Sequence, residues 1–277
     1  MKWSREAEQA VARVPFFVRK KVRQKVEQEA MQAGAAEVTL QHVHSSQRKF
    51  LNNTAKAIRG FAVEACFGGS GCPNRAAPAE GLLEDVERLL AGKNIREFLL
   101  GRVDGPLRMH HQFRVSISDC PNACSRPQIA DIGLIGARQP RLIASECNHC
   151  GLCREICREE AINPDTLPES LILDDAKCLR CGQCIDTCPT GAMAESQLGY
   201  RVLLGGKLGR HPQLGTELDG IFTKEQVLLI IDQCLQHYFK YNRHGERFGE
   251  VLRRHALPED QIGPSAFQCR TLDTLHH

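Results

Sequence analysis

Cysteine spacing is the feature of this chain that points most directly to chemistry. Twelve of the 14 cysteines fall into three sets of four. Two sets repeat the spacing C-x2-C-x2-C-x3-C, and they are Cys147, Cys150, Cys153 and Cys157, then Cys178, Cys181, Cys184 and Cys188. The third set has the spacing C-x5-C…C-x3-C, and it is Cys66, Cys72, Cys120 and Cys124. Thiolates suit soft iron, and a cubane takes one thiolate on each of its four irons. The pattern therefore predicts three [4Fe–4S] clusters and a protein that moves electrons.

Two other uses of many cysteines fit the sequence less well. A disulfide scaffold is typical of small secreted chains, whereas these 277 residues are 42% hydrophobic and can bury an ordinary core. Zinc sites rarely use eight cysteines in a repeated order. The N-terminus shows no secretory signal, and the longest apolar run, Val227–Ile231, is too short to span a bilayer. We therefore expect a cytoplasmic protein with reduced thiols and no membrane association.

The formal net charge of +3 describes the chain without cofactors. Clusters held by four thiolates are anionic, so the excess of Lys and Arg is expected to compensate bound clusters and not to bind nucleic acid. The densest basic run, Arg19–Lys25, lies on a helical pattern and indicates a solvated helix face.

Four segments are expected along the chain. Residues 1–45 predict a helical module in which Ser4 caps a first helix, Pro15 opens a second and 37–43 form a strand. Residues 145–192 hold the repeated cysteine motifs at an offset of 31 residues, between two parts of a larger domain formed by 46–144 and 193–277.

Within this larger domain the sequence predicts elements that position the third cysteine set. A helix is expected at 78–92, and an alternating strand from Phe113 runs directly into Cys120. Pro73 suggests a helix start after Cys72. Residues 223–226 fit a capping box, and the helix that follows has its apolar residues on one side. These are Val227, Ile230, Ile231, Cys234, Leu235 and Tyr238.

The repeated motifs resemble a bacterial two-cluster ferredoxin, in which the fourth cysteine of each motif binds the other cluster. The resemblance implies that one cluster is held by Cys147, Cys150, Cys153 and Cys188, and the other by Cys178, Cys181, Cys184 and Cys157. The second motif keeps the usual proline after its last cysteine, whereas Arg158 replaces it in the first.

The third set lies in segments that resemble the sulfite/nitrite reductase family. These segments are Cys66-Phe-Gly-Gly-Ser-Gly-Cys72-Pro, Val115-Ser-Ile-Ser-Asp-Cys-Pro-Asn-Ala-Cys124, Gly199–Pro212 and Glu246–Gly249. The resemblance implies a [4Fe–4S] cluster whose last ligand, Cys124, is also the axial ligand of a siroheme iron. Gly68 and Gly69 would allow close approach to the cofactors, and Asn122 would fix the cysteine loop or hydrogen-bond cluster sulfur.

The resemblance also implies catalytic partners. Siroheme carboxylates and a small anionic substrate such as sulfite or nitrite need cations, and the candidates are Arg75, Arg114, Arg126, Lys207 and Arg210. Family members have two related halves, whereas this chain matches the cluster-bearing half, so a homo-oligomer is expected to supply the other. The expected fold is α+β: a single cluster half-domain with an inserted two-cluster ferredoxin-like module and a small helical N-terminal module.

The N-terminal module has a resemblance of its own. Trp3-Ser-Arg-Glu-Ala-Glu and Val14–Val22 are similar to the small C-terminal domain of the light-independent protochlorophyllide reductase B subunit. A helical docking or oligomerisation module is the alternative interpretation.

Three functions remain open at this point. The first is a siroheme-dependent reductase of sulfite, nitrite or a related anion, fed by an external donor such as a ferredoxin. The second is a three-cluster electron carrier that serves a separate reductase. The third is a tetrapyrrole-binding protein.

Overall fold

The computed structural model describes residues 1–163, 172–258 and 262. The chain divides into two compact units, one formed by residues 1–59 and 103–110 and the other by the remaining residues from Gly60 onward. Cys269, which belongs to none of the three cysteine sets, lies outside the described residues.

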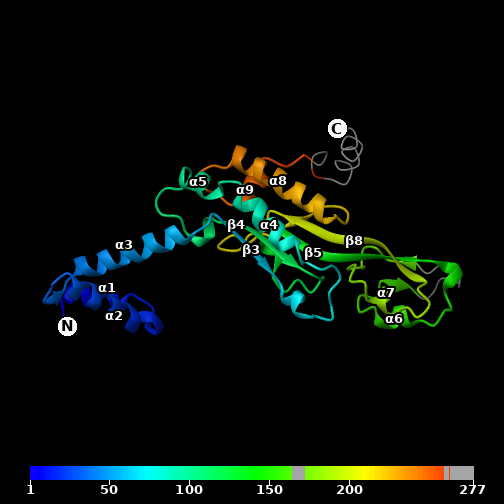
Figure 1. Ribbon diagram of the computed structural model, residues 1–277, viewed down its shortest axis with the longest axis horizontal. Coiled ribbons are helices and arrows are strands. Elements are labelled where there is room, and N and C mark those ends of the chain that lie inside the picture. Colours follow the sequence, from blue (N-terminus) through cyan, green and yellow to red (C-terminus); the bar gives the residue numbers. More distant parts are fainter. Residues whose placement is uncertain (164–171, 259–261, 263–277) are drawn as a thin grey trace. The chain divides into compact units, whose positions relative to one another are not determined.

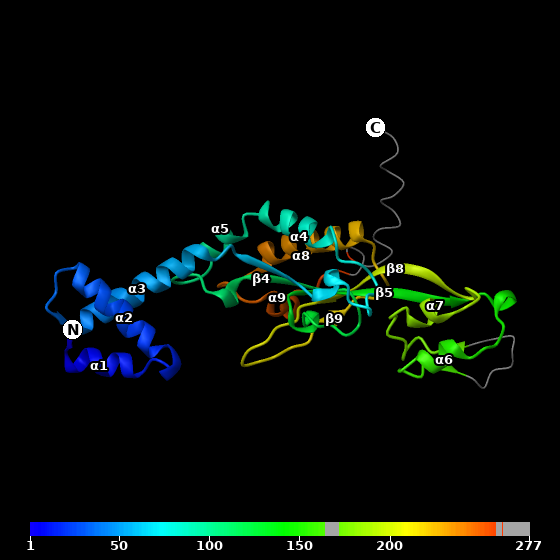
Figure 2. The same ribbon diagram turned by 60° about the horizontal axis from the view of Figure 1, so that its bottom comes forward.

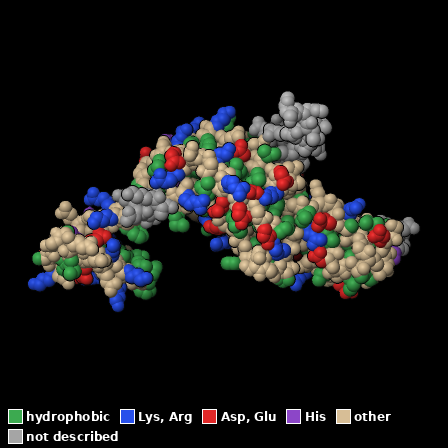
Figure 3. Space-filling view, in the orientation of Figure 1, with side chains coloured by type: hydrophobic (Ala, Val, Ile, Leu, Met, Phe, Trp, Pro, Cys, Tyr) green, Lys and Arg blue, Asp and Glu red, His purple; other side chains and the backbone are tan. Residues whose placement is uncertain are grey.

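The first unit is helical. Its helices are α1 (Arg5–Ala12), α2 (Phe16–Gln32) and α3 (Leu40–Ala57), and a parallel pair of short strands, β1 (Lys2–Trp3) and β2 (Glu37–Val38), joins them. The Ser4 side chain accepts a hydrogen bond from the Ala7 amide at 3.3 Å, which confirms the predicted cap. The core consists of small apolar side chains, Ala7, Val11, Val26, Ala30, Val38 and Val43. Apolar and basic side chains share the visible face of this unit, and Phe16 and Phe17 are exposed (Figure 3).

The strand predicted at 37–43 is wrong beyond Val38. The chain turns into α3 at Leu40, and the Thr39 carbonyl accepts the first hydrogen bonds of that helix from His42 and Val43. A short alternating stretch cannot be distinguished from the first turn of a helix by its period alone.

The second unit is built on a mixed five-stranded sheet in the order β3-β4-β5-β8-β9 (Figure 1). The strands are β3 (Phe61–Ala65), β4 (Phe113–Ser118), β5 (Ile132–Leu142), β8 (Met193–Leu204) and β9 (Thr216–Glu217). The pairs β3–β4 and β4–β5 are parallel, whereas β5–β8 and β8–β9 are antiparallel.

Helices α4 (Leu82–Ala91) and α8 (Lys224–Tyr241) lie together on one side of the strands (Figure 2). Two shorter helices are α5 (Ile95–Leu100) and α9 (Phe248–Arg254), and α9 contacts α8. Tyr238 of α8 meets Phe113 of β4 with ring centroids 5.4 Å apart. The predicted capping box is present, with the Gln226 amide 3.4 Å from the Thr223 hydroxyl and the Thr223 amide 2.8 Å from the Gln226 side chain. All six apolar residues predicted for the α8 core face are buried.

The opposite face of the sheet carries the connection between β4 and β5. This connection includes the short 3-10 turn Pro127–Ile129 and crosses the strands directly, so Ala123 packs against Ile135 and Leu203. Gly133 makes the approach possible, because a Cβ atom there would lie 2.2 Å from the Pro127 carbonyl oxygen. Hydroxyl groups support the same crossing, with Ser116 donating to the Ser125 carbonyl at 2.7 Å.

A small segment joins the far ends of β5 and β8. It contains the helices α6 (Leu152–Ile156) and α7 (Gln183–Thr187) and the strands β6 (Ile162–Asn163) and β7 (Ile172–Leu173), which pair antiparallel. The remaining 3-10 turns are Phe67–Ser70, Met109–His111 and Ala144–Glu146. The helix expected after Pro73 is absent from the described residues, where 73–74 form a turn, and α4 begins at Leu82 and not at 78. No helix in the described ranges is long and apolar enough to cross a membrane.

Candidate functional site

The third cysteine set meets at the carboxyl ends of two neighbouring strands. Cys66 follows β3 and Cys120 follows β4, and these strands are parallel with Ala65 opposite Ile117. The Cys66 sulfur accepts backbone N–H groups from Gly68 at 3.4 Å and from Asp119 at 3.3 Å. A thiolate is the form of cysteine that binds iron.

The other three cysteines of this set lie within electrostatic reach of Cys120. Burial raises the pKa of the Cys120 thiol, and the charges of Cys72, Cys124 and Cys66 raise it further, whereas the backbone amide of Asn122 lowers it. Cys120 is buried, whereas Cys124, on the connection between β4 and β5, is exposed. Cys124 is therefore the most accessible member of this set.

Asp119 is a residue of this site that the sequence prediction missed. Its side chain is 3% exposed and lies 2.9 Å from the Nε atom of Arg75, while its carbonyl accepts the amides of Ala76 and Ala77 at 2.8 and 3.0 Å. Burial raises the pKa of Asp119, and the Arg75 charge opposes that shift. The signal in the sequence is an acidic residue directly before Cys120, at the end of a buried strand.

The two candidate glycines differ sharply. A Cβ atom at Gly68 would lie 2.1 Å from the Asp119 carboxylate, whereas one at Gly69 would meet only Glu80, at 3.8 Å. Close packing therefore requires glycine at the first position and not at the second.

The five candidate cations fall into two groups. Three are engaged by carboxylates: Arg75 by Asp119 and Glu80, Arg114 by Glu64, and the buried Lys207 by Glu250. Arg126 and Arg210 are exposed and have no ion-pair partner among the described residues. Arg126 follows Cys124 by two residues and adopts a left-handed backbone conformation with φ 60°.

In the structure the last cysteine of each repeated motif lies within electrostatic reach of a cysteine of the other motif. Burial raises the pKa of Cys153, and its nearest cysteine charges are Cys188 and Cys147. Burial likewise raises the pKa of Cys178, whose neighbouring cysteine charges are Cys181 and Cys157. Burial raises the pKa of Cys184 to about 12, with Cys181 and Cys178 as its first neighbours.

The backbone repeats with the cysteines. His149 and Arg180 occupy equivalent positions and have φ 60° and 59°, and Gly151 and Gly182, which precede α6 and α7, have φ 80° and 79°. The two motifs therefore have nearly equal φ angles at these two equivalent positions.

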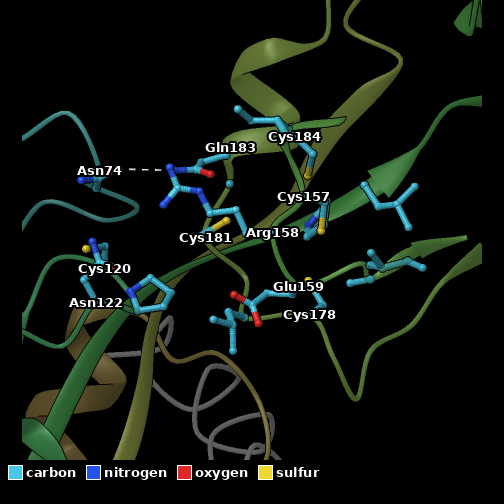
Figure 4. A pocket seen from close by; sticks show the side chains of 18 residues that line it. Asn74, Cys120, Asn122, Cys157, Arg158, Glu159, Cys178, Cys181, Gln183 and Cys184 are labelled. Atoms are coloured by element: carbon cyan, nitrogen blue, oxygen red, sulfur yellow. Dashed lines mark hydrogen bonds between the residues drawn. The ribbon is translucent and has the colours of Figure 1, made fainter. Parts of the chain in front are cut away.

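A cavity of about 200 Å³ connects the second repeat with the third cysteine set. Cys157, Cys178, Cys181 and Cys184 line one side of it, and Cys120 lines the other (Figure 4). The side chain of Gln183 donates a long hydrogen bond of 3.5 Å to Asn74, which follows Cys72 by two residues.

The donors of these sets fit iron–sulfur clusters in number and chemistry. Each set offers four thiols, and the Nε atom of Arg180 is buried beside one set without a hydrogen-bond partner in the described part of the chain, as expected next to an anion. Within residues 1–163, 172–258 and 262, no three His, Cys, Asp or Glu side chains converge on a single metal ion. A cubane instead spreads its ligands over four irons.

Comparison with known families supports at least one [4Fe–4S] cluster. Residues 68–259 match the nitrite and sulphite reductase 4Fe-4S domain, so the chain belongs to this family of iron–sulfur redox proteins. Residues 3–45 match the proto-chlorophyllide reductase 57 kD subunit family, as the N-terminal resemblance predicts.

Individual relatives are larger proteins. The coenzyme F420-dependent sulfite reductase of Methanocaldococcus jannaschii is 33% identical over 195 residues, which are 70% of this chain and 29% of that protein. The beta subunit of the dissimilatory-type sulfite reductase of Archaeoglobus fulgidus is 29% identical over 110 residues, covering 36% of this chain and 30% of that protein. The chain thus spans less than a third of the length of either relative. The crystal structure of dissimilatory sulfite reductase I aligns with a TM-score of 0.46 and 16% identity, covering 70% of this chain and 49% of that one.

Proposed function

We propose that the chain is a siroheme-dependent reductase of sulfite, nitrite or a related small anion. Cys124 carries this proposal, because it belongs to a set of four cysteines and is exposed. The names of the relatives support sulfite as the first substrate to test.

Three [4Fe–4S] clusters would be held by the three cysteine sets, the two in the ferredoxin-like insert by the exchanged motifs. When bound, the clusters supply single electrons, and siroheme supplies an iron that binds the anion. The hydrogen bond between Gln183 and Asn74 would link the insert to the loop that follows Cys72. An external low-potential donor such as a ferredoxin delivers the electrons, in the cytoplasm, where thiols stay reduced.

The five cations of the site would have two different roles. Arg126 and Arg210, which have no carboxylate partner among the described residues, are suited to bind siroheme carboxylates or the substrate anion. Arg75, Arg114 and Lys207 are held by carboxylates and are better suited to keep the cysteine loops and the sheet edge in place. A second copy of the chain would supply the cations that the other half provides in longer relatives.

A second function rests on a specific observation. The eight cysteines of the insert would hold two electron-carrying clusters whether or not the third set binds siroheme, so a three-cluster carrier without siroheme is the alternative. A tetrapyrrole-binding role without turnover would rest on the match of residues 3–45.

The test is an anaerobic absorption spectrum of the purified protein with iron and sulfide assays. We expect a Soret band and a red-region band together with iron for three clusters, followed by turnover with sulfite or nitrite. Replacing Cys124 by Ser should remove the siroheme bands and turnover while the eight insert cysteines keep their clusters. Iron for three clusters without a Soret band would leave the carrier as the function of this chain.

A further inference from the structure

Arg180 has an unusual position in the second cysteine motif. It lies between Cys178 and Cys181 and adopts a left-handed backbone with φ 59°. Its Nε atom is buried and has no hydrogen-bond partner within the described ranges. A buried guanidinium donor without a partner is costly unless an anion accepts it.

The structure places Arg180 within electrostatic reach of one thiol of this motif, Cys178. Burial raises the pKa of Cys178, and the positive charge of Arg180 counteracts that rise. Among the described residues, no carboxylate lies within ion-pair distance of Arg180. Its charge is therefore available to whatever Cys178 binds.

A second arginine, Arg138 of β5, contacts the loop that contains Arg180. Its backbone N–H donates to the Arg180 carbonyl at 2.8 Å. Its side chain passes beneath Gly182, where a Cβ atom would lie 2.8 Å from the Arg138 Cδ atom. The guanidinium then pairs with Asp186 and with Glu195, each at 2.7 Å, so its own charge is already balanced.

We propose that Arg180 is the cationic partner of the cluster held by Cys157, Cys178, Cys181 and Cys184, and that Arg138 is the residue that positions it. The inference rests on the proposed function only in that this set binds a [4Fe–4S] cluster. Reduction adds one electron to the cluster without breaking a bond, and the adjacent cation stabilises the more negative reduced form more strongly than the oxidised form. Arg180 therefore raises the reduction potential of this cluster.

The internal repeat offers a built-in comparison. The position equivalent to Arg180 in the first motif is His149, which has the same backbone conformation but is exposed. The two motifs therefore place different side chains at the same position of the loop, an exposed His149 and an Arg180 whose Nε atom is buried.

The experiment is an EPR-monitored redox titration of the full chain under anaerobic conditions, with iron analysis of each variant. We expect R180Q to keep the iron content and to move the midpoint potential of one cluster to a more negative value. R180K should restore most of that potential, because the charge returns. The signal that shifts is assigned with C181S, which changes the EPR spectrum of the same cluster.

Two further variants separate positioning from charge. R138Q should move the same midpoint in the same direction, and the R138Q/R180Q double variant should shift it no further than R180Q alone, because Arg138 acts through Arg180. R141Q removes the same charge from an exposed position on the same strand and should leave all potentials unchanged.

An unchanged midpoint in R180Q with full iron content would overturn the inference. Loss of this cluster in both R180Q and R180K would also overturn it, because Arg180 would then be needed for assembly and not for potential. The titration requires neither siroheme nor turnover. A chain without siroheme bands would contradict the reductase proposal, whereas the proposed role of Arg180 would still be tested by the midpoint potentials.

Discussion

Asp119 and Gly68 share one small space beside Cys66. The carboxylate of Asp119 occupies the volume that any side chain at position 68 would need, and the amides of both residues donate to the Cys66 sulfur. The position of Cys66, the first cysteine of the third set, therefore depends on glycine at position 68.

Replacing Gly68 by Ala should cost the third cluster and spare the other two. The new methyl group would lie 2.1 Å from the Asp119 carboxylate, so the loop that carries Cys66 must move. Iron analysis should show the loss of one cluster, and loss of a supporting contact typically costs about 10–100-fold in metal affinity.

Gly69 provides the matched control for this change. A methyl group at Gly69 makes an ordinary contact of 3.8 Å with Glu80, so G69A should keep all three clusters. Equal iron contents in G68A and G69A would show that the Asp119 contact does not constrain the cysteine loop.

At the scale of elements, α9 is fastened to the start of β5 by a buried ion pair. Arg247 precedes α9, and its guanidinium donates two hydrogen bonds to Asp131, at 3.1 and 2.6 Å. The Asp131 side chain is 1% exposed and also accepts the Arg114 amide at 2.8 Å. Burial raises the pKa of Asp131, and Arg247 opposes that shift.

Replacing Arg247 by Gln should destabilise the sheet. Removal of one member leaves Asp131 as an uncompensated buried carboxyl, which costs about 3–5 kcal/mol for a buried pair. Anaerobic urea unfolding measures the loss. R253Q, on an exposed arginine of the same helix, should change the free energy of unfolding by less than about 0.5 kcal/mol. Equal effects of the two variants would rule out the fastening role.

Elements could be predicted from the sequence where a pattern is long or chemically specific. The α8 core face is predictable in full because six apolar residues follow the helical period, and β4 is predictable because its alternation ends at Cys120. The strand expected at 37–43 fails because seven residues are too few to separate the two periods.

The roles of the cations, in contrast, could not be predicted from the sequence. Arg75, Arg114 and Lys207 flank the cysteine segments in sequence, but each is held by a carboxylate in the folded chain. The partner of Arg75, Asp119, is 44 residues away in sequence, so a local pattern cannot reveal the pair. The sequence does not single out Arg180 for the same reason, because burial and the lack of a partner are properties of the folded chain.

At the scale of the whole molecule, charge is distributed unevenly. Residues 1–59 hold 12 Lys and Arg against 5 Asp and Glu, and they contain none of the cysteines. The rest of the chain holds 24 Lys and Arg against 28 Asp and Glu. The excess of basic residues therefore lies in residues 1–59 and not in the part of the chain that holds the three cysteine sets.

The insert and the sheet should also be separable. Leu142 of β5 and Met193 of β8 are paired across an antiparallel ladder, so a two-residue Asn-Gly turn can replace residues 143–192 without changing the register. Helices α4 and α8 and the four cysteines of the third set all lie outside the deleted segment. The shortened chain should fold and bind iron for one cluster.

Iron and sulfide assays with far-UV circular dichroism measure both outcomes for this deletion. A matched full-length variant with the eight insert cysteines changed to Ser controls for the loss of two clusters without the loss of the segment. If the deletion removes the third cluster but the Ser variant keeps it, the contacts of Arg138 with Asp186 and of Asn74 with Gln183 are needed to hold the third site. If both variants keep it, the third site is a property of the sheet and its crossing loop alone.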